Sequence, residues 1–203
     1  MNYDNNRHNA HNEIDRIFKV LFPTRNMAER PEQATLCHRM LGAMLEGGIA
    51  LCDVGTGIGK TYAYLVAGTV YSRFRAACGL VAKPILVSTS SIALQTAARD
   101  EYLPLLSELL TEDGMIAHPL QAVIRKGKSH YVCDARLERR LGQLDLQKKN
   151  WKTGAALLSL RGQLDMDEAA HLSGYDRERV CVPRICDCGR ETCHYLSFLM
   201  YPE

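Results

Sequence analysis

A glycine-rich segment between a short apolar run and a helical run is the feature that most constrains this chain. The apolar run ends at Asp53, three glycines follow at alternate positions, and Lys60 and Thr61 come directly after them. Glycines let successive backbone N–H groups converge on an anion, and the N-terminus of a following helix adds partial positive charge. In a phosphate-binding loop the lysine reaches the β- and γ-phosphates and the hydroxyl ligates Mg²⁺. The segment therefore predicts a nucleoside-triphosphate site, formed by Gly55, Thr56, Gly57, Ile58, Gly59, Lys60 and Thr61.

Length, composition and charge bound the class of protein. A chain of 203 residues with 46% hydrophobic residues forms one large domain, or one domain plus an insertion. No apolar run approaches the ~20 residues of a membrane span, and the net charge of +2 says little about partners. The polar residues 1–12 lack the apolar centre of a secretion signal and predict a solvated tail. Eight cysteines in such a chain indicate a reducing compartment and metal chemistry, and the cytoplasm is the expected location.

Apolar runs that alternate with helical patterns predict an α/β fold. Apolar residues at helical spacing predict a short helix over residues 14–22 and a second one that opens at Pro31. Short and nearly continuous apolar runs predict buried strands at residues 49–53, 84–88 and 121–124. Because these strands alternate with helices, we expect a mainly parallel sheet.

The character of the chain changes at Arg125. Residues 125–152 hold nine Lys or Arg against three acids, interleaved with Tyr131 and Trp151. Such a segment is what a groove that follows a nucleic-acid backbone needs. A solvated helical face has the same composition, so both interpretations stay open.

Four cysteines near the C-terminus form a candidate metal-binding cluster. Cys181, Cys186, Cys188 and Cys193 lie within thirteen residues, and Cys133 stands alone upstream. Zinc takes four thiolates, commonly as two close pairs, whereas an iron–sulfur cluster accepts looser spacings. The absence of a C-x-x-C pair in the sequence favours iron–sulfur without excluding zinc.

Together these motifs resemble the N-terminal part of superfamily 2 DNA helicases of the XPD/DinG type. Arg30–Gln33 resembles the adenine-recognising segment of that family, and Asp53–Thr61 resembles its motif I, E-A-G-T-G-T-G-K-T. Val87–Gln95 resembles motif Ia, Lys126–Cys133 resembles K-G-R-x-N-Y-x-C, and Cys193–Tyr195 resembles the closing C-x-Y. The resemblance extends from about residue 27 to the end of the chain, and it departs from motif I at Asp53, Val54 and Ile58.

The resemblance implies a RecA-like P-loop motor domain with a mainly parallel sheet and a helical iron–sulfur insertion. We expect an N-terminal tail and short helix over residues 1–26, an ATP-binding domain over 27–128 and an iron–sulfur domain over 129–203. The implied activity is that of an ATP-dependent DNA helicase, which couples ATP hydrolysis to 5′ to 3′ movement on single-stranded DNA and to duplex unwinding in DNA repair. Its partner would be single-stranded or forked DNA, and a monomer is favoured.

The resemblance also assigns roles to single residues. Arg30 and Gln33 would recognise adenine, while Lys60 and Thr61 would be catalytic through the phosphates and Mg²⁺. Thr89, Lys126 and Lys128 would contact DNA. The ligands of a [4Fe–4S] cluster would be Cys133, Cys181, Cys186 and Cys193, with Cys188 as the alternative third ligand.

One family motif has no counterpart in this sequence. The D-E-A-H motif that binds Mg²⁺ and activates water follows the cluster segment in the family, and the similar Asp167–His171 precedes the cysteines and has one alanine too many. We therefore expect a fragment or a truncated relative whose own hydrolysis and unwinding are very weak. The alternative is a non-motor, nucleotide-binding and zinc-containing module that binds nucleic acid, or an accessory protein of a mobile element or CRISPR system.

Overall fold

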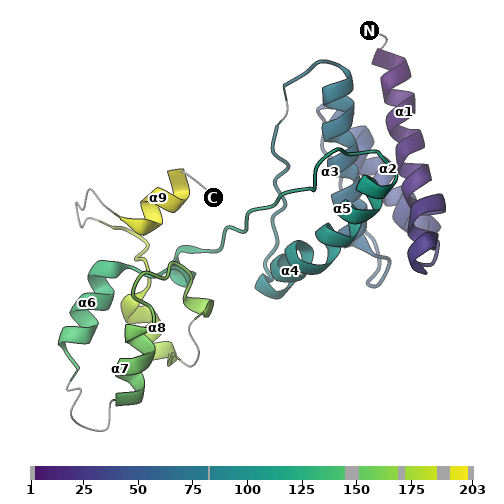
Figure 1. Cartoon of the computed structure of the whole chain (residues 1–203). Helices are drawn as coiled ribbons and strands as arrows, with labels where there is room; N and C mark the ends of the chain where they lie inside the picture. Colours follow the sequence, from purple (N-terminus) through teal and green to yellow (C-terminus); the bar gives the residue numbers. More distant parts are fainter. Residues whose placement is uncertain (1–2, 82, 145–150, 169–171, 187–192, 201–203) are drawn as a thin grey trace. The chain divides into compact units, whose positions relative to one another are not determined.

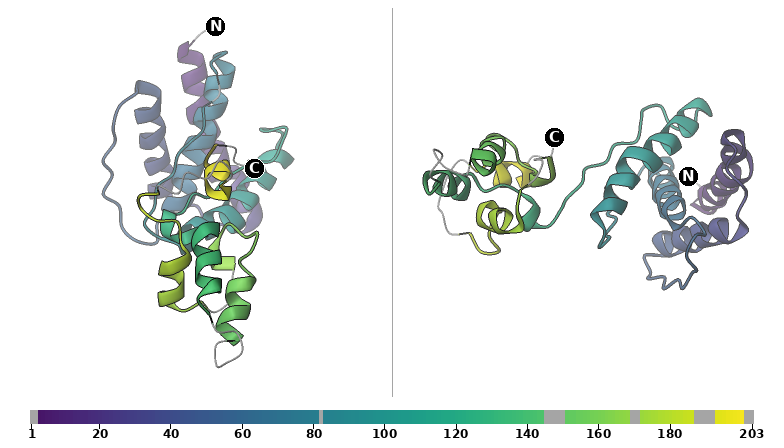
Figure 2. Two further views of the ribbon diagram at one scale, coloured as in Figure 1. Left: turned by 90° about the vertical axis from the view of Figure 1, so that its left-hand side faces the viewer. Right: turned by 90° about the horizontal axis from the view of Figure 1, so that it is seen from below.

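The computed structural model describes residues 3–81, 83–144, 151–168, 172–186 and 193–200 (Figure 1). The chain divides into two compact units, Met1–Ala122 and Val123–Glu203. Both units are built from helices and irregular segments, and Figure 2 shows the same helices from two further directions. No helix within the described ranges is long and apolar enough to cross a membrane.

The first unit packs its helices around one hydrophobic core. Its helices are α1 (Tyr3–Arg16), α2 (Pro31–Glu46), α3 (Lys60–Ala77), α4 (Ile92–Ala97) and α5 (Leu103–Glu112). A π-helical turn over Ile17–Leu21 and a 3-10 turn over Phe22–Arg25 extend α1, and a second π-helical turn over Ala98–Tyr102 joins α4 to α5. Contacts between α1, α2 and α3 hold the unit together.

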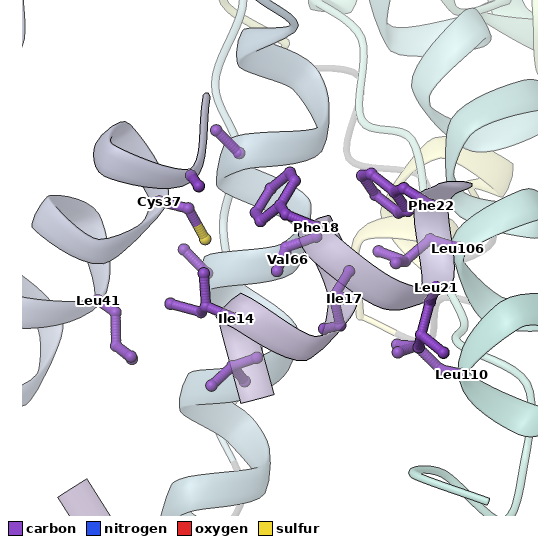
Figure 3. Packing of buried hydrophobic residues seen from close by; sticks show 14 of the residues in the cluster. Ile14, Ile17, Phe18, Leu21, Phe22, Cys37, Leu41, Val66, Leu106 and Leu110 are labelled. Carbon is purple, nitrogen blue, oxygen red and sulfur yellow. The ribbon is translucent and has the colours of Figure 1, made fainter. Parts of the chain in front are cut away.

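The core of the first unit is formed by apolar residues at helical spacing. Ile14, Ile17 and Phe18 from the end of α1 and its extension point into the space between the other helices (Figure 3). Side chains of α2, α3 and α5, among them Leu41, Val66, Leu106 and Leu110, meet them there (Figure 3). Spacings of three and four residues place such side chains on one helix face, so burial of that face fixes the helix.

The polar N-terminus is a helix rather than the solvated tail that its composition predicts. Helix α1 begins at Tyr3, whose ring packs edge-on against Phe74 at 5.3 Å and whose hydroxyl donates to the Leu45 carbonyl at 3.2 Å. Arg7 pairs with Glu46 at 2.7 Å. These partners lie far away in the sequence, so a polar segment is held in place by tertiary contacts that local composition does not reveal.

The prediction of a RecA-like, mainly parallel sheet is wrong. No β-strand occurs in the described part of the chain, and the segments 49–53, 84–88 and 121–124 run as irregular chain. Ile49, Leu51 and Leu86 are 93%, 96% and 92% exposed, so these apolar side chains lack the cover that a buried strand has. A parallel strand needs hydrogen-bonding neighbours on its edges and helices on its faces, and within the described residues these segments have no ladder partner.

The second unit is small and helical. It contains α6 (Asp134–Gly142), α7 (Trp151–Leu158), α8 (Gly174–Val180) and α9 (His194–Met200), with 3-10 turns at Lys128–His130 and Met166–Glu168. Two isolated antiparallel bridges, Tyr131 to Asp165 and Val132 to Cys181, connect its segments. Helix α6 packs against α7 and α8 over a core that contains Leu137, Leu157, Leu160, Met166 and Val180.

Candidate functional site

Two glycines of the glycine-rich loop adopt backbone angles that favour glycine. Gly57 and Gly59 have positive φ angles of 85° and 84°, which lie in the left-handed region that residues with a Cβ rarely adopt. Gly59 directly precedes α3, and no side chain caps the first turn of that helix. The helix therefore presents uncapped N–H groups and a partial positive charge at the end of the loop, which suits an anion.

Lys60 lies over the loop with its ammonium group inside the turn. Its Nζ donates to the carbonyls of Val54 at 3.2 Å and Gly55 at 2.7 Å. These two carbonyls are neutral acceptors, whereas a phosphate oxygen is charged and forms a stronger hydrogen bond with an ammonium group. A phosphate that reached the loop would therefore compete with these carbonyls for the ammonium group.

The structure brings the predicted adenine-recognising residues to the phosphate loop. Gln33, which is 4% exposed, donates through Nε2 to the Gly59 carbonyl at 2.5 Å. Arg30 donates through Nη1 to the Gly57 carbonyl at 2.6 Å. Arg30 is the N-cap residue of α2 and Gln33 lies in its first turn. They precede the loop residues that they contact by 27 and 26 positions in the sequence. The resemblance named these residues and the loop separately, and the fold joins them into one site.

A cavity of about 1140 Å³ opens beside the loop within the first unit. Small-molecule sites commonly enclose about 300–1,000 Å³, so the cavity is large enough for a nucleotide. Arg30, Gln33, Lys60 and Thr61 line it. Thr89, the expected DNA contact, lines the same cavity, and its hydroxyl accepts a hydrogen bond from the backbone N–H of Ser91.

An aromatic wall of the cavity was missed by the sequence analysis. Tyr62 and Tyr102 line the cavity, and their rings meet edge to face at 5.2 Å. The ring of Phe22 also packs edge to face against Tyr62 at 5.0 Å. Burial raises the pKa of Tyr62, and the neighbouring Tyr102 and Glu101 raise it further. The sequence gives one signal for this wall, which is the position of Tyr62 directly after the loop motif. It gives none for the ring contacts, because the aromatic partners of Tyr62 come from distant segments.

The predicted cluster ligands fall in the second unit. The bridge between Val132 and Cys181 sets Cys133 beside the segment that contains Cys181, and the Cys133 N–H donates to the Val180 carbonyl at 2.8 Å. Cys193 and Cys133 both pack against a small core of Tyr131, Val182 and Tyr195. Cys186 is exposed, and Cys188 lies outside the described residues.

The cysteines match an iron–sulfur cluster in donor chemistry, since thiolates are its usual ligands. Within the described residues, however, no three His, Cys, Asp or Glu side chains stand ready to hold a metal ion. Arg136 donates to the Cys181 carbonyl at 2.8 Å and approaches its sulfur at 3.8 Å, which places positive charge beside one thiol. By contrast Cys37 is buried in the core of the first unit, where burial raises the pKa of its thiol, in keeping with a packing role.

The two lysines expected at DNA have different surroundings. Lys126 is only 10% exposed and pairs through Nζ with Asp165 at 2.5 Å and Asp167 at 2.7 Å. Burial opposes the charge of Lys126, but the two carboxylates outweigh it and raise its pKa. Lys128 is exposed and donates to the Arg184 carbonyl at 3.2 Å. The charge of Lys126 is thus already neutralised within the protein, whereas that of Lys128 faces solvent.

The glycine-rich loop, the lysine at its end, and the glutamine and arginine that donate to its carbonyls lie together in the first unit. Comparison with known proteins shows that this chain is related to the DinG and YoaA helicases, which confirms the resemblance of its motifs. The ATP-dependent DNA helicase YoaA of Escherichia coli is 35% identical over 121 residues, which are 60% of this chain and 15% of the relative. The ATP-dependent DNA helicase DinG of Photobacterium profundum is 31% identical over 101 residues, 50% of this chain and 12% of the relative.

A third relative carries a different activity in its name. The 3′-5′ exonuclease DinG of Bacillus subtilis is 28% identical over 145 residues, which are 71% of this chain and 14% of the relative. The chain thus spans about 12–15% of the length of these relatives. No protein-family model matches the chain, and no solved structure matches it.

Proposed function

We propose that this chain is the ATP-binding portion of a DinG-type ATP-dependent DNA helicase, which moves 5′ to 3′ along single-stranded DNA and separates duplexes. The observation that carries the proposal is the junction of Gln33 and Arg30 with the phosphate loop. A glycine-rich turn with a surface lysine needs no such partners. In a nucleotide site the two contacts would have a use, because they place an amide and a guanidinium at the edge of the turn that would bind phosphate.

Each residue of the site has a defined task in this proposal. Lys60 leaves the carbonyls of Val54 and Gly55 and binds the β- and γ-phosphates, while the N–H groups of the loop and of α3 surround the same oxygens. The Thr61 hydroxyl would hold Mg²⁺, which would neutralise charge on the phosphates. Gln33 would read the edge of adenine with the amide atoms that it does not give to the Gly59 carbonyl, and Arg30 fixes the loop through Gly57.

Binding of ATP tests this part of the proposal directly. Lys60→Ala should weaken the binding of a fluorescent ATP analogue by about tenfold or more, because a charged hydrogen bond to phosphate contributes about 1.5–3 kcal/mol. Lys19→Ala is the matched control, since Lys19 lies in the same unit and pairs with Asp15 on the surface. Equal affinity of the Lys60 variant and the control would show that the loop does not bind phosphate.

The cysteines complete the proposal as ligands of a [4Fe–4S] cluster with a mainly structural role. Cys133, Cys181, Cys186 and Cys193 would hold it, with Cys188 as the alternative third ligand. The cluster would tie the loop before α9 to the start of α6 and so fix the insertion against which a duplex is opened.

Metal analysis separates this proposal from a zinc module. Protein purified without oxygen should contain iron and acid-labile sulfide at about four each per chain. Cys193→Ser should lose both, whereas Cys78→Ser in the first unit should keep both. One zinc per chain without sulfide would instead support the non-motor nucleic-acid-binding module.

A further inference from the structure

Four arginines from α6 and α8 gather around one small hollow of the second unit. Arg136, Arg139 and Arg140 of α6 and Arg179 of α8 line a space of about 120 Å³ together with Gln143. The α6 residues follow spacings of three and four, which place them on one helix face. A space of this size exceeds what one water molecule needs and suits a single tetrahedral oxyanion. We call this group of five residues the arginine cradle.

The cradle keeps unneutralised positive charge. Arg140 pairs with the buried Asp176 at 2.9 Å, which anchors it to α8. Arg136 donates to the carbonyls of Cys181 at 2.8 Å and Glu178 at 2.7 Å, so it is held in place by neutral acceptors. For Arg139 and Arg179 the structure shows no carboxylate partner among the residues it describes. Two exposed guanidinium groups are therefore free to bind an anion.

An exposed aromatic ring borders the cradle. Tyr175 of α8 is 57% exposed, and the guanidinium of Arg179 lies 4.2 Å from the centre of its ring. Arg140 approaches the same ring at 5.4 Å. Stacked arginine and tyrosine beside a basic surface are typical of proteins that bind single strands, where phosphates meet the charges and bases stack on the ring.

We propose that the arginine cradle binds one phosphodiester group of single-stranded DNA, with Tyr175 available to the adjoining base. The inference deepens the proposed helicase function and rests on it for the choice of DNA as ligand. Guanidinium groups suit this task because each presents a planar pair of donors to a phosphate. The cradle is formed by α6, which starts directly after Cys133, and α8, which ends directly before Cys181. A cluster bound to both cysteines would therefore fix the distance between the phosphate-binding arginines of the two helices.

The double variant Arg139→Gln/Arg179→Gln tests the cradle in the complete chain. Its affinity for a fluorescent oligodeoxythymidine, measured by anisotropy without ATP, should fall about tenfold. The slope of log affinity against log salt should become shallower by about 0.7 for each phosphate that the variant no longer binds. Arg7→Gln/Arg25→Gln is the control, because it removes the same charge from exposed ion pairs of the first unit and should leave both quantities unchanged.

Further arms separate the cradle from simpler explanations. Arg139→Lys/Arg179→Lys keeps the charge, so it should retain the salt slope and lose less affinity than the glutamine variant. An equal loss in the control, or no loss in the glutamine variant, would overturn the proposal. The proposal would also be overturned if the wild type bound inorganic phosphate saturably and the glutamine variant lost this binding but kept its affinity for DNA. The DNA-binding assay contains no ATP. A failure of ATP to bind in the separate nucleotide assay would therefore not change its result, so the arginine cradle and the ATP site can be refuted independently.

Discussion

Replacement of Gly59 by alanine tests whether the phosphate loop and α2 form one site. Gly59 has a φ of 84°, and a Cβ there would lie 2.0 Å from Nε2 and 2.9 Å from Cδ of Gln33. The left-handed conformation costs a residue with a Cβ about 1–2 kcal/mol. The Gln33 side chain would also have to leave the Gly59 carbonyl, and loss of that partly buried hydrogen bond adds about 1 kcal/mol. We therefore expect Gly59→Ala to lower the free energy of unfolding by about 2–3 kcal/mol.

Gly57 supplies a matched control for this experiment. Its φ is 85°, yet a Cβ at this position would meet no atom within 4 Å, so Gly57→Ala carries the backbone strain without the clash. Urea unfolding followed by circular dichroism should place Gly59→Ala about 1 kcal/mol below Gly57→Ala. Adding Gln33→Ala should remove most of this difference, because the side chain that clashes is gone. Equal stability of the two glycine variants would refute the close approach of Gln33 to the loop.

The remaining predictions concern other parts of the fold. Lys126→Met should cost about 1–3 kcal/mol in urea unfolding, less than a fully buried pair because its carboxylate partners are partly exposed. Burial acts to raise the pKa of Asp167, but Lys126 and Arg177 lower it to about 2, so the stability it contributes is present above pH 3.8 and is lost as the pH falls through about 2. Burial, and then the stacked His38 of α2, lower the pKa of His11 below 6.5. The melting temperature should therefore fall as the pH drops below 6.5, because the unfolded chain then binds a proton more readily than the folded one. The fall should be smaller in His11→Gln. Gly68→Ala should gain less in urea unfolding than the about 1 kcal/mol by which alanine exceeds glycine inside a helix, because its Cβ would lie 3.0 Å from Ile85.

Each of these predictions has its own contrary result. An acid unfolding profile that is the same with and without the Lys126 side chain would show that Asp167 does not depend on it. A melting temperature that is flat across pH 6.5 in the wild type would contradict burial of His11. Gly68→Ala should give its full gain only in a chain that already carries Ile85→Ala, and an equal gain in both backgrounds would contradict this contact.

Local sequence determined the parts of this protein that depend on near neighbours. The glycines of the phosphate loop and the helix that begins at Lys60 follow from backbone freedom and short-range hydrogen bonding, which the motif itself encodes. The helix that opens at Pro31 and stops before Gly47 is equally local, because proline suits the first turn and Gly47 adopts the left-handed cap at φ 66°. The motifs also showed the relation to DinG-type helicases.

Tertiary structure alone decided the rest. Apolar runs predicted a sheet, but a strand exists only where other segments offer a ladder, and among the described residues segments 49–53 and 84–88 have none. The helical state of the polar N-terminus, the contact of Gln33 with Gly59, and the meeting of Arg139 with Arg179 each join positions 26 or more residues apart. Such pairs depend on how helices pack, and the free energy of that packing is a property of the assembled surfaces rather than of any single segment.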